Sequence, residues 1–201
     1  MDEQALIRDS QQGDLTAFNR LVLAYQDLAF NIAYRMLGDE ARAEECTQES
    51  FFSAYRHIHS YRGGSFKAWV LRMVTNACYD ELRRRKRRPV IPLEPVNDTD
   101  EEIESPAWLA SSEPSPEEVV HLKELDTAID HCLSTLLPDF RSVVILVDVQ
   151  NMEYEEVSSI LKSPLGTIKS RLARARQKMR DCLQGFEELL PSEYRHEQEG
   201  K

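Results

Sequence analysis

Residues 153–180, EYEEVSSILKSPLGTIKSRLARARQKMR, decide how the second half of the chain folds. The first nine residues predict a short helix, which a break at Lys162-Ser163 separates from a long helix beginning at Pro164. We expect Ser163 to be the N-cap of the long helix and Pro164 to take its first position. Seven basic residues and no acidic residue lie from 162 to 180. A short helix, a tight turn and a longer cationic helix are typical of a helix-turn-helix, whose second helix enters the major groove of DNA.

The outer faces of the long helix carry the side chains that we expect to contact DNA. The inward stripe is apolar at helical spacing, from Ile168 to Met179. Lysine and arginine can bridge guanine acceptors or bind phosphates, and serine can do either. A solvated basic face on an ordinary helix is the alternative, but the lack of any acid behind a capped turn favours DNA binding. The candidate DNA contacts are Thr167, Lys169, Ser170, Arg171, Ala173 and Arg174.

Charge divides the chain of 201 residues into two parts joined by a tether. The net charge is −10, from 25 basic and 35 acidic residues. Residues 89–118 hold nine of the acidic residues, six of the nine prolines and no basic residue, directly after a run of six cations at 83–88. Prolines break helices and like charges extend a chain, so this stretch is expected to be a flexible linker averaging ~30 Å from end to end.

The patterning on both sides of the linker is helical. Apolar residues recur at spacings of three and four in 15–37, 40–58, 66–82 and 117–136. The β-branched run FRSVVILVDVQ at 140–150 could be a strand, but its helical surroundings favour a buried helix. The sequence therefore predicts an all-α fold of two small helical domains joined by an acidic Pro-rich flexible linker, the second domain containing a helix-turn-helix. The expected divisions are a first domain at 1–88, the linker at 89–116, a second domain at 117–190 and a tail at 191–201.

Several kinds of site and location are disfavoured. The four cysteines lie more than thirty residues apart with no Cys-x-x-Cys, so buried or half-buried thiols are expected rather than disulfides or zinc ligands. The five histidines form no ligand set, and we expect no metal and no cofactor. No apolar run approaches the ~20 residues that span a bilayer, and no signal peptide is visible, so a cytoplasmic location without membrane insertion is expected.

Four segments, in order, resemble one known family over almost the full length. GDLTAFNRLVLAYQDLAFNIAYRMLGD at 13–39 is similar to the family's opening helix, and AEECTQESFFSAY at 43–55 to its A-E-D-x-x-Q-E-x-F signature. FKAWVLRMVTNACYDELRRRKRRP at 66–89 resembles its third helix, and the segment at 137–176 resembles its promoter-reading helix-turn-helix. The chain thus resembles the extracytoplasmic-function sigma factors of bacterial RNA polymerase.

The resemblance implies that the first domain binds RNA polymerase core and helps to open promoter DNA. The polymerase clamp would contact one polar helix face, which on its own would be interpreted as solvated: Glu44, Glu45, Gln48 and Glu49. The loop at 60–65 would hold a base flipped from the non-template strand, whereas Phe66 and Trp69 are expected in the core. The residues implied for the melted element and the adjacent duplex are Tyr61, Arg62, Ser65, Arg72, Asn76, Asp80, Arg83 and Arg84.

The second domain would read the upstream promoter element and reach the polymerase flap, with Arg141 on a DNA phosphate. Two residues depart from the family pattern: Ala173 stands where some relatives carry a bulky side chain, and Arg42 where an acidic residue is usual. The acidic linker would either enter polymerase channels as a polyanion or serve as a charged spacer. An anti-sigma factor that masks both domains is the further partner that the resemblance implies.

Two other functions compete with this interpretation. A helix-turn-helix activator that is not a polymerase subunit would explain 120–185 but not the first domain. A nucleic-acid-processing enzyme would need a phosphate loop, an HExxH motif or a catalytic constellation, and the sequence has none of these. We therefore expect a sigma factor and not an enzyme.

Overall fold

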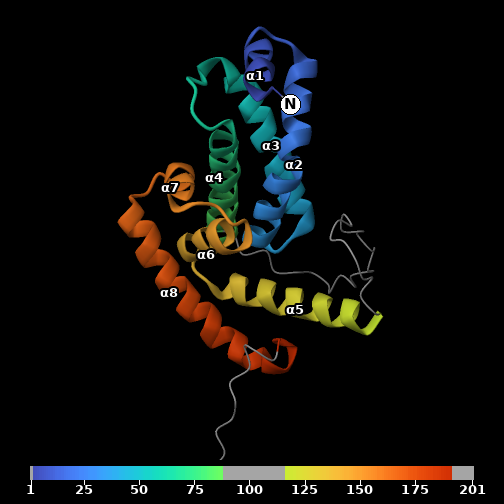
Figure 1. Cartoon of the computed structure of the whole chain (residues 1–201), viewed down its shortest axis with the longest axis vertical. Helices are drawn as coiled ribbons and strands as arrows, with labels where there is room; N and C mark the ends of the chain where they lie inside the picture. The colour runs from blue at the N-terminus through green and yellow to red at the C-terminus, as the bar shows by residue number, and fades with distance from the viewer. Residues whose placement is uncertain (1, 88–115, 192–201) are drawn as a thin grey trace, which may run out of the picture.

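The computed structural model describes residues 2–87 and 116–191, and every element within these ranges is helical (Figure 1). The first range contains α1 (Glu3–Gln11), α2 (Leu15–Leu37), α3 (Glu40–His57), the 3-10 turn η1 (Ile58–Ser60) and α4 (Phe66–Arg87). The second contains α5 (Pro116–Thr135), α6 (Pro138–Val144), η2 (Ile145–Val149), α7 (Tyr154–Leu161), α8 (Leu165–Leu183) and η3 (Gln184–Leu189). The all-α prediction is confirmed, while the expectations for the linker and the tail concern residues of which all but Pro116, the first residue of α5, and Pro191 lie outside the described ranges.

Aspartate caps and one left-handed glycine set the bounds of the first helices. The carboxylate of Asp14 accepts hydrogen bonds from the backbone N–H groups of Thr16 and Ala17, and Gly38, at φ 63°, ends α2. Asp39 caps α3 in the same way. The expected helices at 15–37 and 40–58 are thereby confirmed, with the last residue of the second lying in η1. Together with α4 these helices form a hydrophobic core, in which Leu21, Ile32, Met36 and Leu71 are fully buried.

The β-branched run at 140–150 is helical, as predicted. It begins as α6 and continues through η2, a single stretch of wider π-helical turns. Val143, Ile145 and Leu146 are completely buried there, so the run is a core helix rather than a strand.

The turn of the helix-turn-helix differs in detail from the prediction. Lys162 adopts the left-handed conformation, at φ 48°, and ends α7, while Pro164 precedes α8 in an extended conformation. The hydroxyl of Ser163 donates to the carbonyl of Leu161 instead of capping α8. The prediction that Ser163 is the N-cap is therefore wrong, because the backbone reverses at Lys162 and turns the Ser163 side chain back toward α7.

The expectation of four free thiols is also wrong. Cys132 of α5 and Cys182 of α8 form a disulfide that closes a separation of 50 residues, with their Cα atoms 5.7 Å apart. Distance along the chain misled the prediction, because the two helices cross at these residues. Cys46 and Cys78 remain free and buried. Within the described residues no group of three or more His, Cys, Asp and Glu side chains could hold a metal ion, and no helix is long and apolar enough to cross a membrane.

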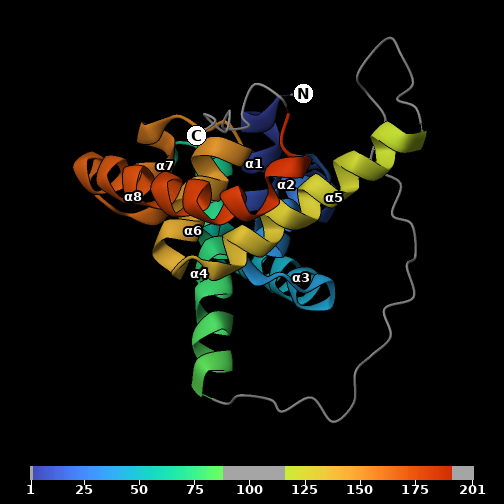
Figure 2. The same ribbon diagram turned by 90° about the horizontal axis from the view of Figure 1, so that it is seen from below.

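The two domains pack against each other in this structure. Figures 1 and 2 show α6 and α7 lying against α4, and α5 crossing the end of α2. Arg35 of α2 forms ion pairs with Asp126 and Asp130 of α5, at 2.7 and 2.6 Å. Lys67 of α4 pairs with Glu156 of α7 at 3.1 Å. The arrangement is therefore closed, with the helix-turn-helix held against the first domain.

Candidate nucleic-acid and partner interface

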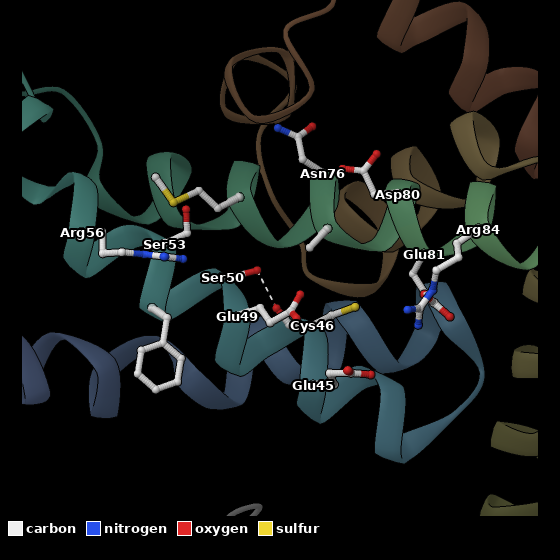
Figure 3. A pocket seen from close by; sticks show the side chains of 13 residues that line it. Glu45, Cys46, Glu49, Ser50, Ser53, Arg56, Asn76, Asp80, Glu81 and Arg84 are labelled. Carbon is white, nitrogen blue, oxygen red and sulfur yellow. Dashed lines mark hydrogen bonds and ion pairs between the residues drawn. The ribbon is translucent and has the colours of Figure 1, made fainter.

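A groove of about 870 Å³ runs between α3 and α4 (Figure 3). Its α3 wall carries Glu45 and Glu49, and its α4 wall carries Asn76 and Asp80. All four side chains are exposed. The first pair was predicted to contact a polymerase clamp and the second pair to face a melted strand, so one groove brings together residues assigned to different partners.

Two further residues of this groove were not predicted. Phe52 is 67% exposed on the α3 side of the groove. Arg56 lies one helical turn later on the same side. The signal was present in the sequence, because only one of the adjacent Phe51 and Phe52 can belong to the inward stripe. The predicted Glu44 and Gln48 are exposed on α3 but do not line the groove.

The loop between η1 and α4 is built around a buried tyrosine. Tyr61 is 7% exposed, donates its hydroxyl to the carbonyl of Gly64 at 2.7 Å and packs edge-on against Phe66. Ser65 caps α4 by accepting a hydrogen bond from the backbone N–H of Ala68. Arg62 points into solvent, between Tyr61 and two glycines that adopt positive φ. Of the three predicted loop residues, only Arg62 and Ser65 are thus open to a ligand in this arrangement.

Glu81 organises the basic end of α4. Only 6% of its side chain is exposed, and it accepts hydrogen bonds from Arg84 and Arg85 of its own helix. Arg42 of α3 donates to the same carboxylate at 2.6 Å, so the residue that departs from the family pattern bridges two helices. Burial alone would raise the pKa of Glu81, but the hydrogen bonds from Arg84 and Arg85 and the charge of Arg42 outweigh it and hold the pKa below its ordinary value.

The cations of α4 therefore fall into two groups. Arg84 and Arg85 are tied to Glu81, and Arg85 also donates to the carbonyl of Leu37. Among the residues that the structure describes, Arg83 pairs with Asp80 alone, and both of these side chains are largely exposed. Lys86 and Arg87 are exposed as well. Within the described part of α4, the exposed cations that are not bound to Glu81 are thus Arg83, Lys86 and Arg87.

The long helix of the helix-turn-helix presents its predicted polar face. Ile168 and Leu172 are buried beneath it, whereas four of the six candidate contacts are exposed on the surface. Lys169 sits over the ring of Tyr154 at 5.7 Å from its centroid, and Arg171 pairs with Asp139 at 2.6 Å. The more exposed contacts are Lys169, Ser170, Ala173 and Arg174, and Thr167 and Arg171 are half-buried.

Comparison with known proteins identifies the family. The sequence matches Sigma-70 region 2 over residues 21–88 and Sigma-70 region 4 over residues 126–179. It is 31% identical over 183 residues to the RNA polymerase sigma-H factor of Pseudomonas aeruginosa, covering 90% of this chain and 94% of that protein. It is 33% identical to the ECF RNA polymerase sigma-E factor of Escherichia coli, covering 88% and 92%. The chain belongs to the ECF RNA polymerase sigma factors.

One further relative and two solved structures with a similar fold extend the comparison. The ECF sigma factor SigE of Mycolicibacterium smegmatis is 34% identical over 172 residues, and this chain spans 63% of its length. The sigma factor RpoE of Bartonella quintana, solved in complex with the anti-sigma factor NepR, shares the fold with a TM-score of 0.62 at 24% identity, covering 84% of this chain and 98% of that one. CnrH, solved with the cytosolic domain of CnrY, shares it with a TM-score of 0.64 at 20% identity, covering 91% and 97%. Sigma factors are transcription initiation factors, so the interpretation as an independent activator is not favoured.

Besides Tyr61 and Arg84, two more predicted DNA contacts of this sigma factor are engaged inside the protein. Arg141 is 8% exposed and donates to the carbonyls of Met36, Ser134 and Leu136, where it joins the end of α5 to α2. Its burial leaves no route to a phosphate in the closed arrangement. Arg72 donates to the carbonyl of Ser159 in α7 at 2.6 Å, so it is free for DNA only when the domains separate.

Proposed function

We propose that this sigma factor binds RNA polymerase core, directs it to promoters with a defined pair of elements and initiates transcription of a signal-responsive regulon. The observation that carries the proposal is the groove between α3 and α4. Its lining includes Glu45 and Glu49 from α3 and Asn76 and Asp80 from α4, so a polymerase surface docked on α3 would lie beside a DNA strand held on α4. Contacts of this kind would couple core binding to the opening of the duplex.

The two domains would divide promoter recognition between them. Lys169, Ser170 and Arg174 are exposed on the outer face of α8 and would read base edges of the upstream element. Arg62 and Ser65, with Asn76, would hold a base of the melted strand, where capture is worth ~1–3 kcal/mol per base. The elements of a promoter lie more than one helical turn (~34 Å) apart, so the domains must separate from the closed arrangement to reach both.

The partners that we propose are RNA polymerase core and an anti-sigma factor. An apolar groove of about 530 Å³ in the second domain, lined by Leu133, Val144, Met179 and Leu183 among others, is suited to an apolar helix such as a polymerase flap would present. The related fold of RpoE was solved bound to NepR, which supports a protein inhibitor here. Acting with polymerase on promoters would place the chain in the cytoplasm, without an enzymatic reaction of its own.

Run-off transcription tests the proposal. Purified bacterial core polymerase is assayed with and without the chain on promoter DNA selected from a genomic library. We expect initiation from discrete start sites only when both are present. Specific binding of duplex DNA by the chain alone, without any effect on core polymerase, would instead establish an activator.

Two substitutions test which partner each side of the groove contacts. Glu49→Lys should weaken association with core polymerase, whereas Asn76→Ala should leave that association intact and reduce opening of the duplex, read by permanganate reactivity of unpaired thymines. Arg20→Ala is the control, because Arg20 is exposed on α2 away from the groove. Equal loss of core binding in both groove variants would contradict the division of roles.

A further inference from the structure

A cavity of about 670 Å³ lies between the two domains. Its walls come from the C-terminal half of α4, from α6 and from the N-terminal half of α8. Arg83 and Lys86 line it from the first domain, and Arg171 and Arg174 line it from the second. Among the described residues that line it, the only carboxylate is that of Asp139, which is 2.6 Å from Arg171. Four cations thus share the cavity with one anion.

Elsewhere the same domain interface is complementary in charge. Arg35 faces Asp126 and Asp130, and Lys67 faces Glu156. Like charges that face each other across a partly enclosed space raise the free energy of the closed arrangement unless an anion neutralises them. The cavity is therefore the place in this interface where an additional anion would stabilise closure.

The cations of the cavity are available to a ligand. Lys86 and Arg174 form no ion pair within residues 2–87 and 116–191. Arg83 pairs with Asp80, but 61% and 72% of these side chains are exposed, so that pair is weak and easily exchanged. Thr167 and Ser170 add hydroxyl groups at the N-terminal end of α8, where the helix dipole also favours negative charge.

We propose that this cavity binds an oligophosphate and that the bound anion holds the two domains together. Guanidinium groups bind phosphate oxygens in a bidentate manner, and one oligophosphate can meet cations from both walls at once. The volume lies in the range of small-ligand sites, ~300–1,000 Å³. Tyr79 and Phe140 also line this cavity and contribute apolar surface, against which the base of a nucleoside polyphosphate could pack.

A bound oligophosphate would inhibit the proposed function. Arg171 and Arg174 would be occupied by the ligand, and α8 would stay against α4, so the upstream element could not be read. Binding of the anion itself requires neither polymerase nor promoter. A test on the free chain therefore remains valid even if the proposed function fails.

Isothermal titration calorimetry of the full-length chain with tripolyphosphate at low salt is the experiment. We expect a single saturable site, and we expect the double variant Arg83→Gln/Lys86→Gln to weaken binding at least about tenfold, because two charge-assisted contacts are lost. Arg174→Gln should also weaken it from the opposite wall. Arg180→Gln removes one charge from α8 outside the cavity, and should change the affinity less than about twofold.

A remote variant tests whether the site needs both domains. Arg35→Glu places a negative charge next to Asp126 and Asp130, at a position outside the cavity. It should weaken tripolyphosphate binding because it disfavours the closed arrangement. Far-ultraviolet circular dichroism and thermal unfolding of every variant show whether a loss reflects unfolding. Unchanged affinity in Arg35→Glu, or in the double variant, would overturn the proposal.

The source of the phosphate is decided by a second titration. A nucleoside triphosphate that binds more tightly than tripolyphosphate would identify a nucleoside polyphosphate as the ligand, and equal affinity would identify an inorganic oligophosphate. Absence of binding would overturn the proposal. So would binding that arises only after the acidic residues of 89–116 are changed to Asn and Gln, since the chain's own carboxylates would then be the occupant.

Discussion

Glu81 is a single buried carboxylate that binds three arginine side chains. Arg42, Arg84 and Arg85 all donate to it, so their charges are used inside the protein. Without Glu81 these three cations would repel one another at the junction of α3 and α4. The residue therefore separates the cations that hold the helix from those that can meet DNA.

Removing this charge should destabilise the first domain. We expect Glu81→Gln to lower the free energy of unfolding by about 1–3 kcal/mol, because a buried acceptor of three charged donors becomes neutral. Urea unfolding at pH 7 measures the change. Asp80→Asn is the matched control on the next residue, where the single ion pair is exposed and a change below ~1 kcal/mol is expected.

The same carboxylate predicts how stability depends on pH. Its pKa is held below the ordinary value in the folded chain, so its contribution is complete above the pKa of the unfolded state. The contribution is lost as the pH falls through the folded pKa. The difference in unfolding free energy between the wild type and Glu81→Gln should therefore be full at pH 7 and shrink toward pH 3. A difference independent of pH would show that Glu81 acts through packing alone.

Two neighbouring arginines of α8 should differ in function. Arg174 has no ion-pair partner within the described residues, whereas Arg176 forms a two-point contact with Asp148. Arg174→Ala should weaken binding of polymerase holoenzyme to the upstream element by about 1–3 kcal/mol. Arg176→Ala, with the same loss of charge, should have a smaller effect. Anisotropy titration of labelled promoter DNA compares them, and a larger loss in Arg176→Ala would reverse the assignment.

At the scale of elements, the disulfide fastens α5 to α8. It closes a loop of about 50 residues. Because a disulfide restricts the unfolded chain, it is expected to raise the free energy of unfolding by ~2–4 kcal/mol. Cys132→Ser should therefore lower the unfolding free energy of the second domain by this amount under non-reducing conditions. Under reducing conditions the variant and the wild type should converge. A thiol count of the unfolded wild type checks the pairing: two reactive thiols show that the disulfide is present, and four that it is absent.

Periodicity and caps in the sequence predicted most elements but not their fine structure. The helices from Leu15 to Leu37 and from Phe66 onward followed from apolar spacing alone. The helix α1 was not predicted, although Leu6 and Ile7 are buried, because its apolar residues are consecutive and form no stripe at helical spacing. The N-cap at Ser163 failed because the left-handed Lys162 is not a residue that sequence rules associate with a chain reversal.

The sequence predicted which residues of the candidate site lie on the surface, but not which of them are bound by other parts of the protein. Arg62, Asn76 and Lys169 lie on the surface, as their roles require. Arg141 could not be assigned correctly, because its three carbonyl partners come together only when α5 ends beside α2. Tertiary contacts of this kind, like the crossing of Cys132 and Cys182, leave no local signal in a single sequence.

At the scale of the whole molecule, the closed arrangement sets the state from which the chain must act. Arg72 is held by α7, and the polar face of α8 lines a cavity against α4. If only a fraction of the free chain is open, its apparent affinity for DNA is reduced by that fraction. Core polymerase would raise DNA binding by holding the two domains apart, so the domain interface links recognition of polymerase to recognition of the promoter.

Opening the interface should therefore raise the affinity of the free chain for upstream-element DNA. Arg35→Glu replaces two ion pairs with repulsion from Asp126 and Asp130, and a change of ~1–2 kcal/mol in the closing equilibrium corresponds to a several-fold gain. Arg20→Glu is the control, because it makes the same change of charge on the same helix at an exposed arginine outside the interface. Fluorescence anisotropy measures DNA binding, and small-angle X-ray scattering measures the expected increase in the radius of gyration. A larger radius without tighter DNA binding would mean that closure does not mask α8, whereas equal gains in both variants would point to a general effect of charge.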